Sequence, residues 1–341
     1  MAFTNEQIQE LREELESSFR PLIFFDDDAD GLSSFLLFYR FIKEGKGVIL
    51  KTYPMLDDKF IRKVEEYHPD KIFILDIPKV SQDFIDNAKT KVVWLDHHQP
   101  AARKNVKYYN PLIKSTNNNT SPTSYWAYKV VEQDIWIAMA GCIGDWFIPD
   151  FKNEFIKEYP DLLSSRIKKP EDALFNSKIG LLAKIFNFIV KGKTSEAMTC
   201  VKILTRINDP YEILEQTSPQ GRFIYKRFQK INTEYDELLK QVKVTNDKII
   251  LFIYSGNKMS FTSDLSNELL YRHQDKFVIT GRTRSGEVKL SLRCGNRKVL
   301  PIVQKALKDV DGYGGGHEHA CGACIKEKDF NKFIDNIEKQ I

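Results

Sequence analysis

The sequence lacks the features that would place this protein outside the ordinary globular class. Its 341 residues contain no apolar run of membrane-spanning length, no internal repeat and no low-complexity tract. Only five cysteines are present, scattered and odd in number, which predicts reduced thiols rather than a disulfide framework. The net charge is only +4, which permits contact with nucleic acid but does not require it. We therefore expect a soluble, cytoplasmic protein with no membrane association.

The order of apolar patterns predicts an α/β protein in three parts. Residues 1–150 alternate β-type runs with helical patterns, which is typical of βαβ units and a parallel sheet. Residues 151–245 read as helices only and form a predicted connector, and residues 246–341 form a second, smaller α/β domain. The expected strands of the first part are 22–25, 48–53, 72–75 and 92–95, its expected helices are 33–43, 59–67, 81–90, 125–131 and 135–143, and residues 117–122 are expected to form a loop.

Acidic residues follow three of these strand-like runs, at the point where each run ends. Asp26, Asp28 and Asp30 follow the first run, Asp76 follows the third, and Asp96-His97-His98 follows the fourth. In an open α/β sheet the carboxyl ends of the strands share one crevice, where ligands bind. Side chains two apart on a strand share a face, so we expect Asp28 and Asp30 to point into one pocket. Crowded carboxylates repel one another unless cations neutralise them, which predicts a divalent-metal centre.

A further acid ends the apolar run before it and completes a candidate ligand set. Asp145 follows Ala140-Gly141-Cys142-Ile143-Gly144. The candidate ligands are Asp28, Asp30, Asp76, His97 and Asp145. Oxygen ligands with few histidines suit Mn²⁺ or Mg²⁺ better than structural zinc. Two such ions about 3.5–4 Å apart would clamp a phosphate and activate a water for in-line attack.

Each part of this pattern also has an ordinary structural interpretation. An acid after a strand is often a helix N-cap, which fits Asp76 before Pro78. The segment from Asp26 to Gly31 fits a solvated turn equally well. The coincidence of such sites at four successive element ends favours a metal centre over these separate explanations.

The motifs together resemble the DHH phosphoesterase superfamily, which includes family II pyrophosphatases and RecJ-type nucleases. The resemblance covers most of the chain, through Asp26 to Gly31, Leu75-Asp76, Asp96-His97-His98 and Gly144-Asp145, in the family's order. It implies that Asp28 and Asp30 bind one metal each and that Asp76 bridges the two ions. It also implies that His97 and Asp145 hold the second ion, and that His98 faces the scissile phosphate.

One departure indicates which branch of the superfamily the chain resembles. Oligoribonuclease-like and pyrophosphatase members place a metal-binding histidine where this chain has Phe24, which cannot coordinate a metal. Asp26 lies two residues before Asp28 instead, as in RecJ-like sequences. Asp26 is therefore expected to support the first metal, either directly or through water.

The C-terminal part carries a glycine-rich segment that resembles the signature of the DHH-associated C-terminal domain. We expect Gly314, Gly315, Gly316 and His317 to form a phosphate-binding loop; the alternative for a glycine run by itself is a flexible turn. The resemblance adds Arg293 as a substrate-contacting residue. The segment from His317 to Cys324 also invites a zinc interpretation, but strand alternation would point its ligands to opposite sides.

The resemblance implies a Mn²⁺-dependent phosphodiesterase, a RecJ-like exonuclease that releases nucleotides from single-stranded DNA or RNA by two-metal hydrolysis. His98, Asp76 and Asp26 would act in catalysis, and two Mn²⁺ ions, or Mg²⁺, would be the cofactors. Two alternatives stay open: an oligoribonuclease or small-nucleotide phosphatase, and an inactive binding subunit associated with replication. Expected partners are single-stranded nucleic acid and proteins of replication or repair.

Overall fold

The computed structural model describes residues 3–51, 55–113, 121–256 and 259–341. Its chain forms two compact units, Met1–Gln229 and Lys230–Ile341, and each is described here by itself. Residues 117–120 of the predicted loop, and 52–53 of the predicted strand 48–53, lie outside the described residues.

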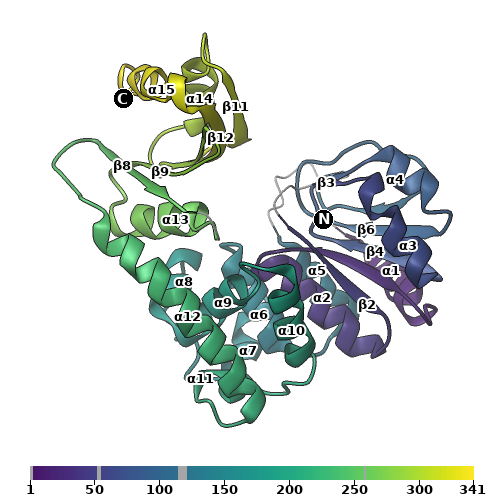
Figure 1. Ribbon diagram of the computed structural model, residues 1–341. Coiled ribbons are helices and arrows are strands. Elements are labelled where there is room, and N and C mark those ends of the chain that lie inside the picture. The colour runs from purple at the N-terminus through teal and green to yellow at the C-terminus, as the bar shows by residue number, and fades with distance from the viewer. Residues whose placement is uncertain (1–2, 52–54, 114–120, 257–258) are drawn as a thin grey trace. The chain divides into compact units, whose positions relative to one another are not determined.

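The first unit is built around a five-stranded parallel sheet in the order β2-β1-β4-β6-β7 (Figure 1). Its strands are β1 (Leu22–Asp26), β2 (Lys46–Leu50), β4 (Lys71–Leu75), β6 (Lys91–Leu95) and β7 (Lys107–Tyr109), and β3 (Met55–Leu56) and β5 (Lys79–Val80) form a separate two-stranded sheet. The predicted parallel α/β architecture is confirmed. The central strands β1 and β4 are buried throughout their apolar residues, because helices cover both faces of the sheet.

Alternate residues of the strands pack against helices on opposite faces. On one face Phe24, Ile74 and Trp94 form a core with α3 (Ile61–Tyr67) and α4 (Gln82–Asn87). On the other face Phe25 stacks on Phe35 of α2 (Ala29–Ile42), with ring centroids 4.5 Å apart. The short 3-10 helix η1 (Asp58–Phe60) precedes α3.

One buried acid fixes the N-terminal helix to the edge of the sheet at which the strands begin. Glu14 of α1 (Asn5–Glu16) forms ion pairs with Lys71, Lys91 and Lys107, which are the first residues of three neighbouring strands. Although burial opposes ionisation, these lysines lower the pKa of Glu14 from 4.5 to about 2. The ion pairs of Glu14 thus hold α1 against the sheet.

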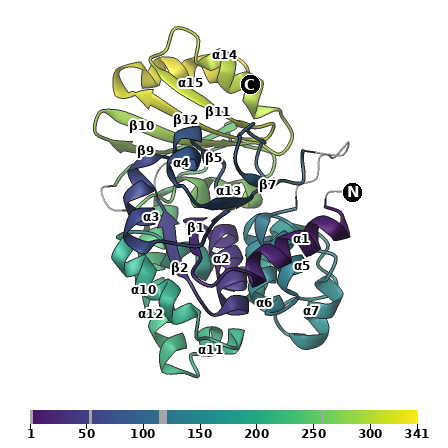
Figure 2. The same cartoon turned by 90° about the vertical axis from the view of Figure 1, so that its right-hand side faces the viewer.

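Residues 151–244 contain helices and no strand, as the sequence pattern predicts. The helices that follow the sheet are α5 (Thr123–Val131), α6 (Ile135–Gly144), α7 (Lys152–Glu158), α8 (Pro170–Asn176), α9 (Lys178–Ile189), α10 (Thr194–Leu204), α11 (Pro210–Leu214) and α12 (Pro219–Gln241). Figure 2 shows α5, α6 and α7 grouped in the first unit beside α2. Among the described residues no helix is long and apolar enough to cross a bilayer.

The second unit contains a mixed five-stranded sheet in the order β11-β12-β10-β9-β8. Its elements are β8 (Ile249–Ser255), α13 (Thr262–Arg272), β9 (Phe277–Arg284), β10 (Glu287–Arg293), α14 (Val299–Ala306), β11 (Gly312–His317), β12 (Ala320–Lys326), η2 (Glu327–Asp329) and α15 (Phe330–Glu338). β8 and β9 pair in parallel, and the remaining strand pairs of the described residues are antiparallel. α14 and α15 cover one face through Val303, Phe333 and Ile337.

The glycine-rich segment does not have the predicted conformation. Gly312–His317 is the edge strand β11, paired along its length with β12, rather than a loop. The glycines permit this close pairing, because a Cβ on Gly316 would lie 2.4 Å from the Ala320 carbonyl oxygen. Gly316 also has φ +144°, a conformation that favours glycine.

Candidate functional site

The strand register aligns three acids at one edge of the parallel sheet. Phe25 pairs with Leu75, and Leu75 pairs with Leu95, so that Asp26, Asp76 and Asp96 follow at the same level of three neighbouring strands. This level is the carboxyl edge, where the sequence predicts the site. Asp76 has φ +61°, in the left-handed region, which an aspartate tolerates better than most residues. Asp76 follows β4, and the next helix, α4, has Ser81 as its N-cap, so the N-cap alternative for Asp76 is wrong.

Asp28 and Asp30 reach the site from a helix rather than from a strand, which corrects the sequence expectation. Strand β1 ends at Asp26, and α2 begins at Ala29, four residues earlier than predicted. Asp28 is the N-cap of α2, and its Oδ1 accepts a hydrogen bond from the Gly31 amide at 2.9 Å. The helix starts early because Asp28 satisfies one of its unpaired N–H groups.

The first turn of α5 holds Asp30 in place. The two carboxylate oxygens of Asp30 accept hydrogen bonds from the backbone amides of Thr123 and Ser124, each at 2.8 Å. The Thr123 hydroxyl also donates to Asp76 Oδ1 at 3.0 Å. Sequence reasoning missed these supports, although Pro122-Thr123-Ser124 carries a recognisable helix-start signal.

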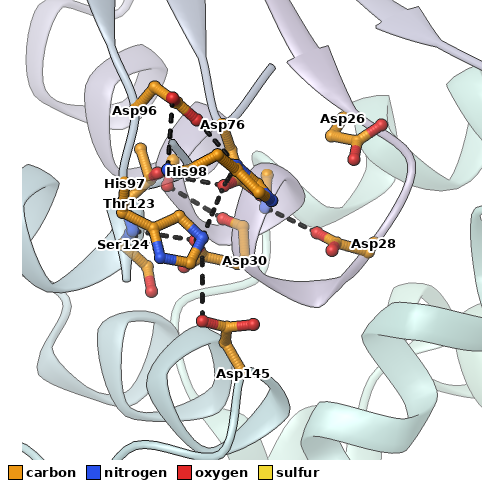
Figure 3. A network of polar contacts seen from close by, with 12 residues as sticks. Asp26, Asp28, Asp30, Asp76, Asp96, His97, His98, Thr123, Ser124 and Asp145 are labelled. Carbon is orange, nitrogen blue, oxygen red and sulfur yellow. Dashed lines mark hydrogen bonds and ion pairs between the residues drawn. The ribbon is translucent and has the colours of Figure 1, made fainter. Parts of the chain in front are cut away.

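His97 lies at the centre of the acidic residues (Figure 3). Its Nε2 is 3.3 Å from Asp76 Oδ1, 3.7 Å from Asp145 Oδ2 and 4.0 Å from Asp30 Oδ2. Asp145 arrives from a different direction, at the C-terminal end of α6. Four separate parts of the chain therefore contribute side chains to one small volume.

His98 is held by a second network on the side of β6. Its Nδ1 is 2.8 Å from Asp96 Oδ1, and Asp96 also accepts hydrogen bonds from Tyr108 and Asn110. Burial by itself lowers the pKa of His98, but the hydrogen bond and charge of Asp96 raise it to about 9. Asp96 therefore favours the protonated form of His98, beside the acidic cluster. The roles of Tyr108 and Asn110 carried no sequence signal that we recognised.

The carboxyl groups of the site outnumber the cationic side chains beside them. Burial, together with neighbouring carboxylates, raises the pKa values of Asp26 and Asp76 well above their usual range, and that of Asp145 likewise. Burial and Asp30 also raise the pKa of Asp28. Among the described residues no lysine or arginine forms an ion pair with these groups. Divalent cations would supply the missing charge.

Three overlapping triads in the site have ligand atoms close enough to hold a metal ion. In each triad the atoms lie within 4.8 Å of one another. The triads are Asp26-Asp28-Asp76, Asp76-His97-His98 and Asp30-His97-Asp145. The residues present thus fit the donor set of Mn²⁺ or Mg²⁺, which prefer carboxylate oxygen with few imidazoles. All five predicted ligands, with Asp26 and His98, lie together here.

The predicted substrate-binding residues of the C-terminal part all belong to the second unit. Arg293 ends β10; its Nε donates to Asn267 Oδ1 at 3.0 Å, and its Nη1 donates to the carbonyl oxygens of Leu292 and Cys321. Burial lowers its pKa to about 10. Gly314, Gly315 and His317 lie on the edge strand β11. The cysteines of the zinc interpretation have separate partners: Cys321 Sγ donates to the His317 carbonyl, and Cys324 Sγ donates to Glu287.

Comparison with known proteins identifies the two domains of this architecture. The model of the DHH family, N-terminal domain, matches residues 20–163, and that of the DHHA1 domain matches residues 236–341. The chain belongs to the DHH family and has the RecJ-like fold. No curated protein matches the sequence.

Solved structures show the same fold at low sequence identity. RecJ from Thermus thermophilus in complex with Mn²⁺ matches with a TM-score of 0.70 and 15% identity, over 100% of this chain and 55% of that one. An exonuclease RecJ bound to manganese matches with a TM-score of 0.64 and 15% identity, over 100% and 95%. The DHH domain of a member of a ribosomal protein family matches with a TM-score of 0.66 and 13% identity, over 98% and 89%. The chain thus spans about half the length of Thermus thermophilus RecJ.

Proposed function

We propose that this protein is a metal-dependent phosphodiesterase that releases nucleotides from the ends of single-stranded DNA or RNA. The observation that carries the proposal is the gathering of Asp28, Asp30, Asp76 and Asp145 around His97, without a lysine or arginine ion pair among the described residues to neutralise them. A cluster of this kind is costly to fold unless it has a cationic ligand. RecJ structures of the same fold contain Mn²⁺.

The donor set suggests how two ions would be held. Asp26 and Asp28 with Asp76 would hold one, and Asp30, His97 and Asp145 would hold the other, with Asp76 between them. When bound, two Mn²⁺ or Mg²⁺ ions would polarise a phosphate and lower the pKa of a water molecule. The hydrogen bonds from Thr123 and Ser124 fix the orientation of Asp30, which a binuclear centre requires.

His98 is the residue of the site best suited to contact the phosphate. Its cationic ring is oriented by Asp96, which leaves Nε2 as a donor for a phosphate oxygen. A positive charge at that position stabilises the negative charge that develops during hydrolysis. Arg293 and the β11 segment of the second unit are proposed to bind the rest of the substrate.

The local environment of Phe24 favours the RecJ-like assignment over the oligoribonuclease alternative. Phe24 is fully buried on the face opposite the helix α2 and makes edge contacts with Phe60 and Phe84, at 5.9 and 5.6 Å between ring centroids. A histidine there would point into this core rather than into the acidic site. Asp26, the last residue of the same strand, takes part in a candidate metal triad instead.

Asp28→Asn tests the proposal with little disturbance to the fold, because asparagine is also a good helix N-cap. We expect nucleotide release from end-labelled single strands with Mn²⁺ to fall at least ~100-fold, since one metal ligand loses its charge. Asp83→Asn, in the exposed first turn of α4, is the matched control and should retain full activity.

Unchanged turnover in Asp28→Asn would refute the proposed centre. Comparing rates on dinucleotides and on long strands of DNA and RNA separates the exonuclease from the oligoribonuclease. Failure of the wild-type protein both to bind Mn²⁺ by calorimetry and to hydrolyse any strand would favour the inactive binding subunit.

A further inference from the structure

An open groove runs along the outer edge of the parallel sheet of the first unit. β2 is the first strand in the sheet order, so its outer side has no neighbouring strand among the described residues. The groove has a volume of about 830 Å³, and its floor is formed by Gly45 to Ile49. Phe60 and Lys63 of η1 and α3 line one side, and Met198 and Lys202 of α10 line the other.

The backbone of β2 presents unused hydrogen-bonding groups to this groove. The Lys46 amide donates to the Pro21 carbonyl at 2.9 Å, and so points toward β1. Because successive residues of a strand alternate, Gly47 and Ile49 direct their N–H and C=O groups away from β1. No backbone partner for Gly47 or Ile49 occurs on that side within the described residues. Such an edge is a template for another strand.

The charge of the groove is of one sign. Four lysines line it, namely Lys46, Lys51, Lys63 and Lys202, and no acidic residue does so within the described part of the chain. Lys51 donates to the Gly192 carbonyl at 2.9 Å, and the Lys46 ammonium lies 5.4 Å from the Tyr67 ring centroid. Lys63 and Lys202 are exposed, and neither forms an ion pair with a described residue. The groove is therefore complementary to an acidic occupant.

We propose that β2 accepts an extended acidic peptide segment of a partner protein as a sixth strand of the sheet. The five residues of β2 span about 17 Å, enough for a peptide of about five residues to pair along it. Side chains of that peptide would alternate between the two walls. Apolar ones would contact Phe60 and Met198, and acidic ones would pair with Lys63 and Lys202.

The groove suits a peptide better than a nucleic-acid strand. Single-stranded nucleic acid binds through exposed aromatic faces on which its bases stack. Here Phe35 is 2% exposed, and Tyr39 and Phe60 are only partly exposed. The outward N–H and C=O groups of Gly47 and Ile49 are spaced to pair with the N–H and C=O groups of another peptide strand. A nucleic-acid strand does not carry amides and carbonyls at this spacing along its backbone, so the edge favours a peptide.

The test is a selection of random displayed nonapeptides against the full chain, followed by fluorescence anisotropy with the enriched peptides. We expect these peptides to carry an apolar and an acidic residue on each of their two faces, because each wall offers one apolar residue and one lysine, and to lack proline. In the double variant Lys63→Glu/Lys202→Glu we expect binding to weaken at least ~10-fold, because two attractive charge pairs become repulsive. Two further sets of the peptides carry N-methyl groups on alternate amides, one set on the odd-numbered and one on the even-numbered residues. We expect the set whose methylated amides face β2 to lose binding, and the set whose methylated amides face away from β2 to keep it.

Two controls separate this proposal from its competitors. The double variant should keep the unfolding temperature and the phosphodiesterase rate of the parent, since neither lysine belongs to the acidic site. A fluorescein-labelled dT15 strand is the second probe. The proposal is overturned if no acidic peptide is enriched, if the double variant binds the peptides equally well, if both methylated sets bind, or if dT15 competes for these lysines.

Discussion

Replacing Asp76 by asparagine should separate the stability of the acidic site from its function. Asp76 is 1% exposed, and burial and the charges of Asp30 and Asp28 raise its pKa well above the usual range. Its ionised form is therefore unfavourable in the metal-free fold. Asparagine has the same shape, tolerates φ +61°, and can still accept the Thr123 hydroxyl.

The metal-free variant is therefore expected to unfold at the same temperature as the wild type or at a higher one. Mn²⁺ at 100 times its Kd should stabilise the wild type by about 2.7 kcal/mol. For a unit of 229 residues this corresponds to an increase of about 5–10 °C in Tm. In Asp76→Asn this increase should nearly vanish, because a carboxylate shared by two of the metal triads has lost its charge.

Differential scanning calorimetry of chelator-treated protein, with and without Mn²⁺, measures both effects. Glu14→Gln is the matched control, because Glu14 is also a buried acid but has three lysine partners. It should lower Tm and leave the Mn²⁺-dependent increase unchanged. A metal-free Asp76→Asn protein that is clearly less stable than the wild type, or that gains as much from Mn²⁺, would refute the reasoning.

Three further predictions concern stability and positioning. Since the Glu14 pKa is lowered from 4.5 to about 2, its ion pairs contribute about 3 kcal/mol above pH 4.5, and this contribution is lost as pH falls from 4.5 to below 2. In denaturant titrations, the stability difference between wild type and Glu14→Gln should therefore shrink by about half between pH 7 and pH 3. Thr123→Val removes the hydroxyl that donates to Asp76 and should lower kcat about 10-fold with KM little changed, which steady-state kinetics would show. Gly316→Ala should destabilise the second unit by about 1–3 kcal/mol, because Gly316 has φ +144° and lies close to the Ala320 carbonyl. Limited proteolysis of the variant should therefore cleave the second unit faster than in the wild type, and cleavage confined to the first unit would contradict this.

Local sequence was sufficient for the strands that precede the acids and for the membership of the acidic site. The four apolar runs are strongly patterned, three of them are followed by acids, and the alternation with helical patterns predicts a parallel sheet. Because parallel strands place their carboxyl ends on one edge, Asp26, Asp76 and the residues after Leu95 could be assigned to one site from the sequence alone.

Tertiary structure decided how those residues are held and what surrounds them. Asp28 is a helix cap and not a strand residue, and Asp30 depends on the amides of Thr123 and Ser124, which are 93 and 94 positions away in the chain. The glycine-rich segment forms a strand because β12 is available to pair with it. Hydrogen-bond partners that are distant in sequence leave no local pattern, since they arise only when the chain has packed. The open edge of β2 is equally invisible in the sequence, because a strand is an edge only with respect to its neighbours.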